Sequence, residues 1–221
     1  MIRTKKLTKT YSRKNTKIKA IDSASIEIPS GDFVSIIGPS GSGKSSLLLT
    51  LGGMLAPTSG TFTIDGESVY DLTPSQRAKL RHEKIGFVFQ TFNLIPYLSA
   101  LQNVQLPLLL GGKNEQQQKE RAVALLKRLG LADRMDHKPP ELSIGQQQRC
   151  ALARMLANDP SIIFADEPTG NLDPETAKKV LNFLHELNEE GRTIIMVTHD
   201  INIANQAKRT ITIKEGKVTE G

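Results

Sequence analysis

A glycine-rich segment at residues 38–45, Gly-Pro-Ser-Gly-Ser-Gly-Lys-Ser, constrains this chain more than any other stretch. It matches the pattern G-x-x-x-x-G-K-[S/T] without a gap. An apolar run at residues 33–37 precedes it and reads as a buried strand, and a helix is predicted over residues 44–51. Such a loop wraps a triphosphate in backbone N–H groups, so glycines are expected where a Cβ would block close approach.

The residues at the end of this loop supply charge and a metal ligand. Lys44 places a positive charge on the β- and γ-phosphates, and the Ser45 hydroxyl is suited to ligate Mg²⁺. The N-terminal dipole of the following helix acts on the same anion. The sequence therefore predicts binding of a nucleoside triphosphate with Mg²⁺ by the residues of this loop, namely Gly38, Ser40, Gly41, Ser42, Gly43, Lys44, Ser45 and Ser46.

Composition sets the broad class of the protein. The 221 residues are 38% hydrophobic and 24% charged, which fits one large globular domain over residues 1–221. The sequence shows no apolar run of the ~20 residues that a membrane-spanning helix needs and no signal-peptide pattern at its start. A cytoplasmic location is expected. Cys150 is the single cysteine, which excludes an internal disulfide and suggests a buried packing residue.

The net charge of +6 is concentrated near the N-terminus. Residues 3–19 hold eight basic residues and no acid, which leaves 21 of the 29 basic residues against all 23 acidic ones elsewhere. Such a cluster suits nucleic acid, an anionic membrane surface, the nucleotide itself or a plain solvated face.

Alternating strand and helix patterns predict an α/β core with a mostly parallel sheet over residues 1–90 and 159–221. Further strands are expected at residues 2–7, 24–28, 85–89, 161–165, 193–197, 210–213 and 217–218. A hairpin turned at Asp65-Gly66 predicts an antiparallel β subdomain beside this core. Thr73 opens a capping box for a helix to about residue 82, and Asp173 is placed to cap a helix that ends before Gly191.

Residues 91–158 change in character and predict an inserted α-helical subdomain. Ser99 opens a second capping box, and Asn114 is expected to cap a helix that closes at Gly130. A third helix is predicted from Ser143 to about residue 157.

Polar residues follow three of the predicted core strands. Gln90 ends the strand at residues 85–89, Asp166 and Glu167 end the next, and His199 follows the strand at residues 193–197. In an open α/β sheet this edge is where ligands bind. Asp166 is suited to hold Mg²⁺ directly or through water, and Glu167 to polarise an attacking water, as hydrolysis of a triphosphate requires.

A further motif identifies a family. The sequence at residues 142–149, Leu-Ser-Ile-Gly-Gln-Gln-Gln-Arg, resembles the signature of ATP-binding-cassette (ABC) proteins, usually Leu-Ser-Gly-Gly-Gln. The glycine-rich loop, Gln90, the Asp166-Glu167 pair, Asn171-Leu172-Asp173 and His199 also stand in the family's order. The resemblance therefore covers the whole chain and implies the ABC ATPase fold. It also implies that Ser143, Gly145 and Gln146 reach the γ-phosphate held by a second copy, in a head-to-tail homodimer formed on ATP.

The resemblance assigns roles to other residues. Tyr11 is expected to stack on adenine, with its basic neighbours explaining the N-terminal cluster. Gln90 is expected to sense Mg²⁺ and the γ-phosphate and to connect to the membrane partner, Asp173 to communicate between subunits, and His199 to contact the γ-phosphate. Ile144 stands where the family usually has glycine, and we expect altered packing there without loss of activity.

Within the family, residues 92–104 and 137–143 resemble the lipoprotein-release and macrolide-exporter group, which also includes a cell-division pair. This implies an ATPase that drives transmembrane permease subunits from the inner face of the cell membrane, with no nucleic-acid partner. The alternatives are an ABC ATPase of a non-transport machine, either of the cell-division type or soluble, and a regulatory module without catalysis. Only 53 positions separate Gln90 from Ser143, too few for the coiled coil of the DNA-repair type.

Overall fold

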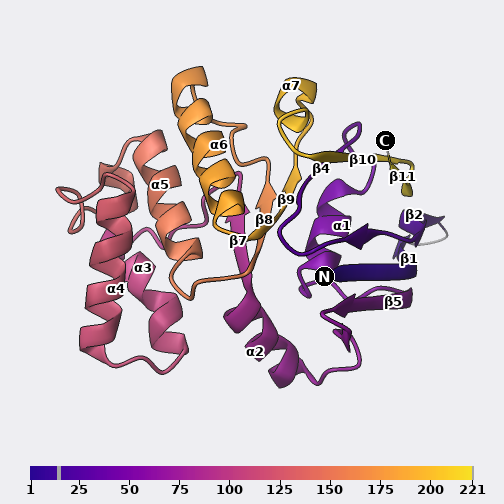
Figure 1. Ribbon diagram of the computed structural model, residues 1–221, viewed down its shortest axis with the longest axis horizontal. Coiled ribbons are helices and arrows are strands. Elements are labelled where there is room, and N and C mark those ends of the chain that lie inside the picture. The colour runs from indigo at the N-terminus through magenta and orange to yellow at the C-terminus, as the bar shows by residue number, and fades with distance from the viewer. Residues whose placement is uncertain (14–15, 221) are drawn as a thin grey trace.

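Two β-sheets and a group of helices make up the computed structural model, which describes residues 1–13 and 16–220 (Figure 1). Lys14, one member of the N-terminal basic cluster, lies outside the described residues. Among the described residues, no helix combines the length and the apolar character needed to cross a bilayer.

The larger sheet has the order β11-β10-β4-β9-β8-β7, and all its neighbouring strands are parallel except the pair β10 and β11. The strands are β4 (Phe33–Ile37), β7 (Ile85–Phe89), β8 (Ile162–Asp166), β9 (Thr193–Val197), β10 (Arg209–Lys214) and β11 (Lys217–Glu220). The central strands are continuous apolar runs because helices or a second sheet cover both faces. The strands predicted in this sheet are therefore confirmed, with ends shifted by at most two residues.

The smaller sheet is antiparallel, in the order β2-β1-β5-β6, with β3 paired to β1. Its strands are β1 (Ile2–Arg13), β2 (Thr16–Ala24), β3 (Glu27–Ile28), β5 (Ser59–Ile64) and β6 (Glu67–Ser68). The strand predicted at residues 24–28 is confirmed only in part: residues 27–28 form β3 and pair with β1, whereas residue 24 ends the longer strand β2, which the sequence did not predict. The first half of β2 is exposed and rich in lysine, so no apolar alternation marks it in the sequence.

Helices divide between the two faces of the parallel sheet. α1 (Lys44–Leu51) lies on the same face as the antiparallel sheet, and Leu47, Leu48 and Leu51 pack with Phe62 of β5. α6 (Pro174–Glu189) covers the opposite face through Val180 and its neighbours. The remaining helices of this part are α2 (Pro74–Lys84) and the short α7 (Ile201–Ala204). The sequence did not predict α7, because four residues are too few for a periodic pattern.

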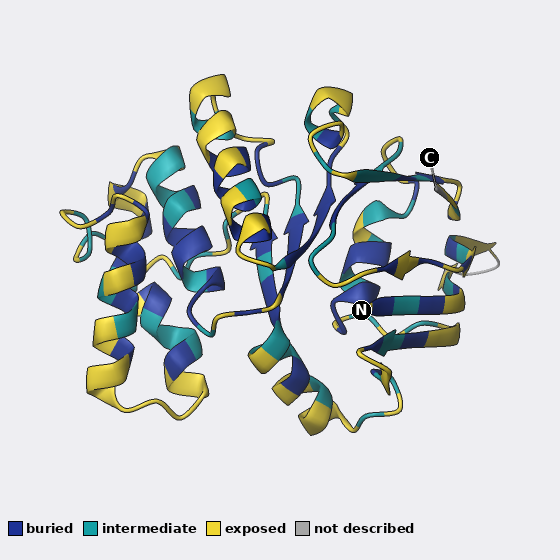
Figure 2. Ribbon diagram, viewed as in Figure 1, coloured by how far each residue is buried: buried dark blue, intermediate teal, exposed yellow. Residues whose placement is uncertain are grey.

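The helical group on the left of Figure 1 is made of α3 (Ala100–Leu110), α4 (Glu115–Arg128), the 3₁₀ turn η1 (Pro139–Glu141) and α5 (Ile144–Met155), which fall within the segment predicted to be helical. Their inward faces are buried and their outer faces exposed (Figure 2). The predicted capping boxes at Thr73 and Ser99 are confirmed, and Asn114 caps α4.

One buried amide fixes the loop that leads into α3. The Asn103 side chain is fully buried; its Oδ1 accepts from the Ile95 N–H at 2.8 Å, and its Nδ2 lies 3.0–3.1 Å from the carbonyls of Ile95, Leu98 and Ser99. An irregular loop beside a core needs such partners for its backbone. Asn103 therefore positions the segment that follows Gln90.

We predict that Asn103→Leu, which keeps the side-chain volume and removes the polar atoms, lowers the free energy of unfolding by about 3 kcal/mol. The reason is that buried N–H and carbonyl groups of the loop lose their hydrogen-bond partner. Urea denaturation measures this. The control is Leu109→Ala on the exposed face of the same helix, expected to change stability by less than about 0.5 kcal/mol. Equal effects of the two substitutions would contradict this role of Asn103.

Candidate functional site

The candidate site lies at the carboxyl edge of the parallel sheet, where the register of the strands brings the predicted residues together. Phe89 of β7 pairs with Asp166 of β8, which pairs with Val197 of β9. Val197 in turn pairs with Ile36 of β4, just before the glycine-rich loop. Gln90, Glu167 and His199 thus leave neighbouring strands beside that loop.

The glycines of the loop have a structural reason that the sequence did not reveal. Gly43 has a φ of 109°, and a Cβ there would lie 1.9 Å from the Ala20 carbonyl oxygen. At Gly38 a Cβ would lie 2.1 Å from the Ile213 carbonyl oxygen. These two positions are therefore glycine because β2 and β10 press against the loop, in addition to the expected approach of phosphate. A Cβ at Gly41 would meet nothing within 4 Å.

Lys44 begins α1 and turns back over the loop. Its Nζ donates to the carbonyls of Gly38 at 2.8 Å and Pro39 at 3.0 Å, which holds the ammonium at the centre of the loop. Ser40 is exposed, whereas Ser42 is buried and its hydroxyl has no hydrogen-bond partner among the described residues. The loop thus gathers a cation and an unpaired hydroxyl, as expected of a site for an anion.

Ser45 and Asp166 form the candidate Mg²⁺ site. Burial raises the pKa of the Asp166 carboxyl, and the nearby Glu167 charge acts in the same direction, while a hydrogen bond with Ser45 and the charge of Lys44 oppose the rise. The hydroxyl and the carboxylate are hard oxygen ligands, which suit Mg²⁺. A partly desolvated carboxylate gains from a bound cation, so these residues fit the metal.

Glu167 and His199 form a pair. His199 Nδ1 lies 2.8 Å from Glu167 Oε1; the imidazole is 70% exposed and the carboxylate side chain only 15%. Glu167 has a φ of 47°, a left-handed conformation that costs a non-glycine residue of order 1–3 kcal/mol. Its N–H donates to the Val197 carbonyl at 2.9 Å. The carboxylate is thereby held at the sheet edge and oriented by the imidazole.

Gln90 contacts the loop that follows Glu167. Asn171 Nδ2 donates to the Gln90 carbonyl at 3.1 Å, and a Cβ on Gly170 would lie 2.9 Å from Gln90 Nε2. The role of Asn171 was not predicted, although the residue stands in the Asn-Leu-Asp sequence that carried part of the resemblance.

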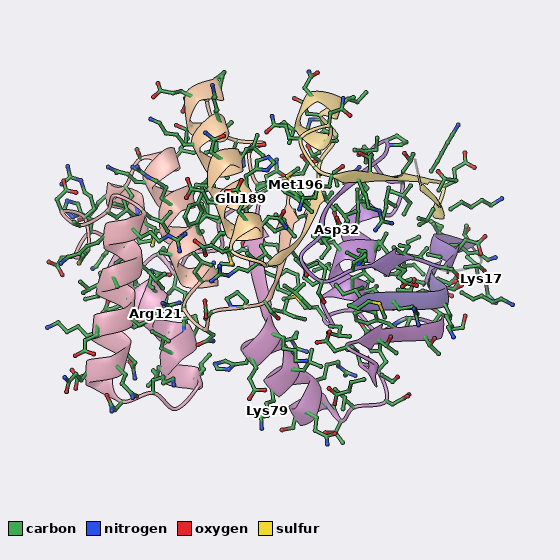
Figure 3. The ribbon with its side chains drawn as sticks, viewed as in Figure 1. Lys17, Asp32, Lys79, Arg121, Glu189 and Met196 are labelled. Carbon is green, nitrogen blue, oxygen red and sulfur yellow. The ribbon has the colours of Figure 1, made fainter. Side chains whose placement is uncertain are left out.

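Tyr11 lies beside the far end of the glycine-rich loop. Its hydroxyl is 3.3 Å from Ser46 Oγ, and Lys9 Nζ stands 5.4 Å from the ring centroid. The ring is 43% exposed. Lys17, on the neighbouring strand β2, marks the outer edge of the molecule (Figure 3). An exposed aromatic face close to the loop is thus available for stacking.

The signature residues lie apart from this cluster. Ser143 is the N-cap of α5, on the opposite side of the molecule from α1 (Figure 1). Its Oγ accepts from the Gln146 N–H at 3.3 Å, and Gln146 Oε1 accepts from the Ser143 N–H at 2.9 Å. Ile144 is 55% exposed, so its side chain does not disturb the interior. The structure therefore does not bring the signature residues to the chain's own glycine-rich loop.

Gly145 of α5 lies against Thr176 in the first turn of α6, the helix that Asp173 caps. A Cβ on Gly145 would lie 3.0 Å from Thr176 Cγ2. Asp173 caps α6 by accepting from the N–H groups of Glu175 and Thr176, and hydrogen bonds from Thr176 lower the pKa of its carboxyl.

The sequence did not predict the polar contacts that Arg154 and Gln148 of α5 make. Arg154 donates to the carbonyls of Phe92 at 2.6 Å and Asn93 at 2.5 Å, and Gln148 donates to the Pro168 carbonyl. The available signal was a polar residue on the apolar side of the helix, because Gln148 stands four positions before the buried Leu152.

Comparison with known proteins gives the family. The family described as "ABC transporter" matches residues 21–170, more than half of the chain. The chain belongs to the ABC transporter family. The macrolide export ATP-binding/permease protein MacB of Syntrophobacter fumaroxidans is 49% identical over 99% of this chain, which spans 31% of that relative. The uncharacterized ABC transporter ATP-binding protein MJ0796 of Methanocaldococcus jannaschii is also 49% identical, over 99% of this chain and 95% of the relative.

Solved structures match the whole ABC chain. A dimeric structure of a post-hydrolysis state of the ATP-binding cassette MJ0796 with ADP and Pi superposes with a TM-score of 0.92 at 45% identity, covering 100% of this chain and 98% of that one. The predicted ABC ATPase fold and the predicted family are therefore confirmed, and the chain is an ATP-binding cassette. Because it spans about a third of the MacB relatives, the partners and cargo of the complete machine are matters for proposal.

The raised pKa of Asp166 predicts a pH-dependent stability effect. Because the folded state favours the protonated carboxyl, ionisation costs stability, and this cost appears as the pH rises through the unfolded pKa of about 3.9. Without metal or nucleotide, Asp166→Asn should therefore have a higher Tm than the parent at neutral pH, with the gap closing below that pKa. Asp136→Asn, at an exposed aspartate, is the control. A gap independent of pH would count against the explanation.

Proposed function

We propose that this cassette hydrolyses ATP between two copies of the chain and so drives a membrane permease, as an exporter or a lipoprotein- or peptide-extruding system. The observation that supports the proposal is the register of β4, β7, β8 and β9, which brings Gln90, Asp166, Glu167 and His199 to the sheet edge from which the glycine-rich loop also leaves. Each of these strand ends supplies at least one group that phosphoryl transfer to water requires, and β8 supplies two, Asp166 and Glu167.

Binding follows from the loop and its neighbours. Lys44 and the N–H groups of the loop hold the phosphates, and Tyr11 stacks on the adenine. Ser45 and Asp166 hold Mg²⁺, with Gln90 beside them. When bound, this metal supplies positive charge to the β- and γ-phosphates.

Hydrolysis follows from the Glu167 and His199 pair. Glu167 accepts a proton from water while the water oxygen bonds to the γ-phosphorus, and the bond between that phosphorus and the oxygen shared with the β-phosphate breaks to release ADP. His199 Nδ1 lies 2.8 Å from the Glu167 carboxylate and orients it. In the proposed complex the exposed ring of His199 also contacts the γ-phosphate. Because the carboxylate is largely withdrawn from solvent, it keeps its orientation between turnovers.

A second copy supplies what one chain lacks. Ser143 and Gly145 stand at the N-terminus of α5, a position suited to bind an anion, yet far from their own loop. A head-to-tail homodimer sets them against the partner's γ-phosphate, with Asp173 at the junction. The structures matched by this chain include a cassette described as dimeric.

The permease partner docks beside the segment after Gln90. A groove of about 1310 Å³ lies between α2 and β7 on one side and α3, α4 and α5 on the other. Its lining includes Arg154, the side chain that holds the carbonyls of Phe92 and Asn93 in that segment. Lys79 and Arg121 line it from α2 and α4 (Figure 3). The relatives named ATP-binding/permease proteins carry about twice as much chain beyond the matched part, in keeping with such a partner. The cassette then sits on the cytoplasmic face of the membrane.

We predict that Glu167→Gln lowers kcat for ATP by at least about 100-fold, because the amide cannot accept the proton, while ATP binding persists. ATP and Mg²⁺ should hold this variant as a dimer on size exclusion with light scattering, whereas the parent returns to monomer as it turns over.

The matched control is Glu189→Gln, an exposed glutamate at the end of α6 (Figure 3), which should hydrolyse ATP like the parent. Parent-like turnover by Glu167→Gln would show that another group takes the proton. A monomeric Glu167→Gln with bound ATP would refute the shared site.

A further inference from the structure

Gln148 is a buried polar residue in the middle of α5. Its side chain is fully buried, and its Nε2 donates to the Pro168 carbonyl at 2.7 Å. The orientation of the amide follows from the partner: a carbonyl oxygen accepts, so the NH₂ group has to face it. This bond joins α5 to the residue directly after Glu167.

This orientation of the Gln148 amide leaves its oxygen without a donor in the described part of the chain, which costs stability. Gln148 Oε1 is buried and has no hydrogen-bond partner among the described residues. A buried acceptor without a donor destabilises a fold, and an apolar side chain of equal length would avoid it. Stability alone therefore does not explain a glutamine here. The contact with Pro168 is the interaction that distinguishes it from an apolar residue.

Pro168 belongs to a short segment that fixes Glu167. Glu167 has a φ of 47°, and its carbonyl accepts from the Gly170 N–H at 3.1 Å while its N–H donates to Val197. Strained backbone persists where its surroundings over-determine it. The Gln148 bond to the next carbonyl adds a third anchor, and it comes from outside the sheet and the loop.

We propose that Gln148 is a positioning residue for Glu167: through the Pro168 carbonyl it holds the backbone that aims the Glu167 carboxylate. This inference rests on the proposed function, in which Glu167 accepts the proton from water. Because the N-terminus of α5 carries Ser143, Gln148 also ties the helix that completes the partner's site to the proton acceptor of its own chain.

The test compares Gln148→Met, which keeps the length and removes the donor, with Gln118→Met. Gln118 is a matched control: it is a buried glutamine of α4 whose Nε2 donates to the Lys113 carbonyl, also at 2.7 Å, away from Glu167. The readouts are kcat, KM, the Kd for a non-hydrolysable ATP analogue, and Tm. We expect Gln148→Met to lower kcat at least about 10-fold with the analogue's Kd unchanged, and Gln118→Met to affect Tm alone.

A second measurement separates positioning from a merely structural role. In a Glu167→Gln background, adding Gln148→Met should change the residual single-turnover rate by less than about two-fold, because the group that Gln148 positions is already gone. Hydrogen exchange at the Gly170 amide should also speed up in Gln148→Met but not in Gln118→Met. An equal fall in rate in both backgrounds, or an unchanged kcat in Gln148→Met, would overturn the proposal.

The remaining outcomes are also decisive. If Gln148→Met does not fold, Gln148→Leu is a smaller apolar side chain that also removes the amide donor, and it enters the same comparison. The proposed function is tested separately by the single variant Glu167→Gln. If this variant turns over ATP like the parent, Glu167 is not the proton acceptor, whatever the effect of Gln148→Met. Loss of turnover in Glu167→Gln with no effect of Gln148→Met removes only the inference about Gln148.

Discussion

The parallel pairing of β7, β8 and β9 is the constraint on which the site depends. Phe89, Asp166 and Val197 share one row of the ladder, so the residues that follow them emerge at one edge. A slip of one residue in β8 would turn Asp166 to the opposite face and carry its apolar neighbours with it. Burial of both faces of β8 prevents that slip, so the apolar core fixes the geometry of the polar edge.

Much of this arrangement could be predicted from short stretches of the sequence. β4, β7 and β9 are apolar runs whose predicted bounds match the structure, and the residues at the strand ends could be named before any contact was known. Strand β2 could not, because its outer half is held by backbone pairing with β1 and carries exposed lysines that give no apolar period. Local pattern predicts elements that bury a face, and fails for those held by a partner strand.

Contacts between distant segments were beyond prediction for a different reason. Gln148 and Pro168 are in contact because α5 packs against the sheet, and the type of either residue does not predict its partner. The same holds for Ala20 against Gly43, where a glycine that reads as a phosphate-loop residue also makes room for a neighbouring strand. Residue type gave the chemistry of the site, and tertiary packing determines which other residues hold it.

Helix α5 contacts three segments that matter to the proposed reaction. In the proposed homodimer its N-cap Ser143 faces the second copy. Within the chain, its middle holds Pro168 beside Glu167 through Gln148, and near its C-terminus Arg154 holds the carbonyls of Phe92 and Asn93 after Gln90. A helix of 12 residues is about 18 Å long and moves as a stiff rod. Under the proposed function, a displacement of the segment after Gln90 reaches through α5 both the Glu167 segment of its own chain and, in the homodimer, the partner's nucleotide. The buried polar contacts of this helix thus provide a physical route from a docking surface to two sites.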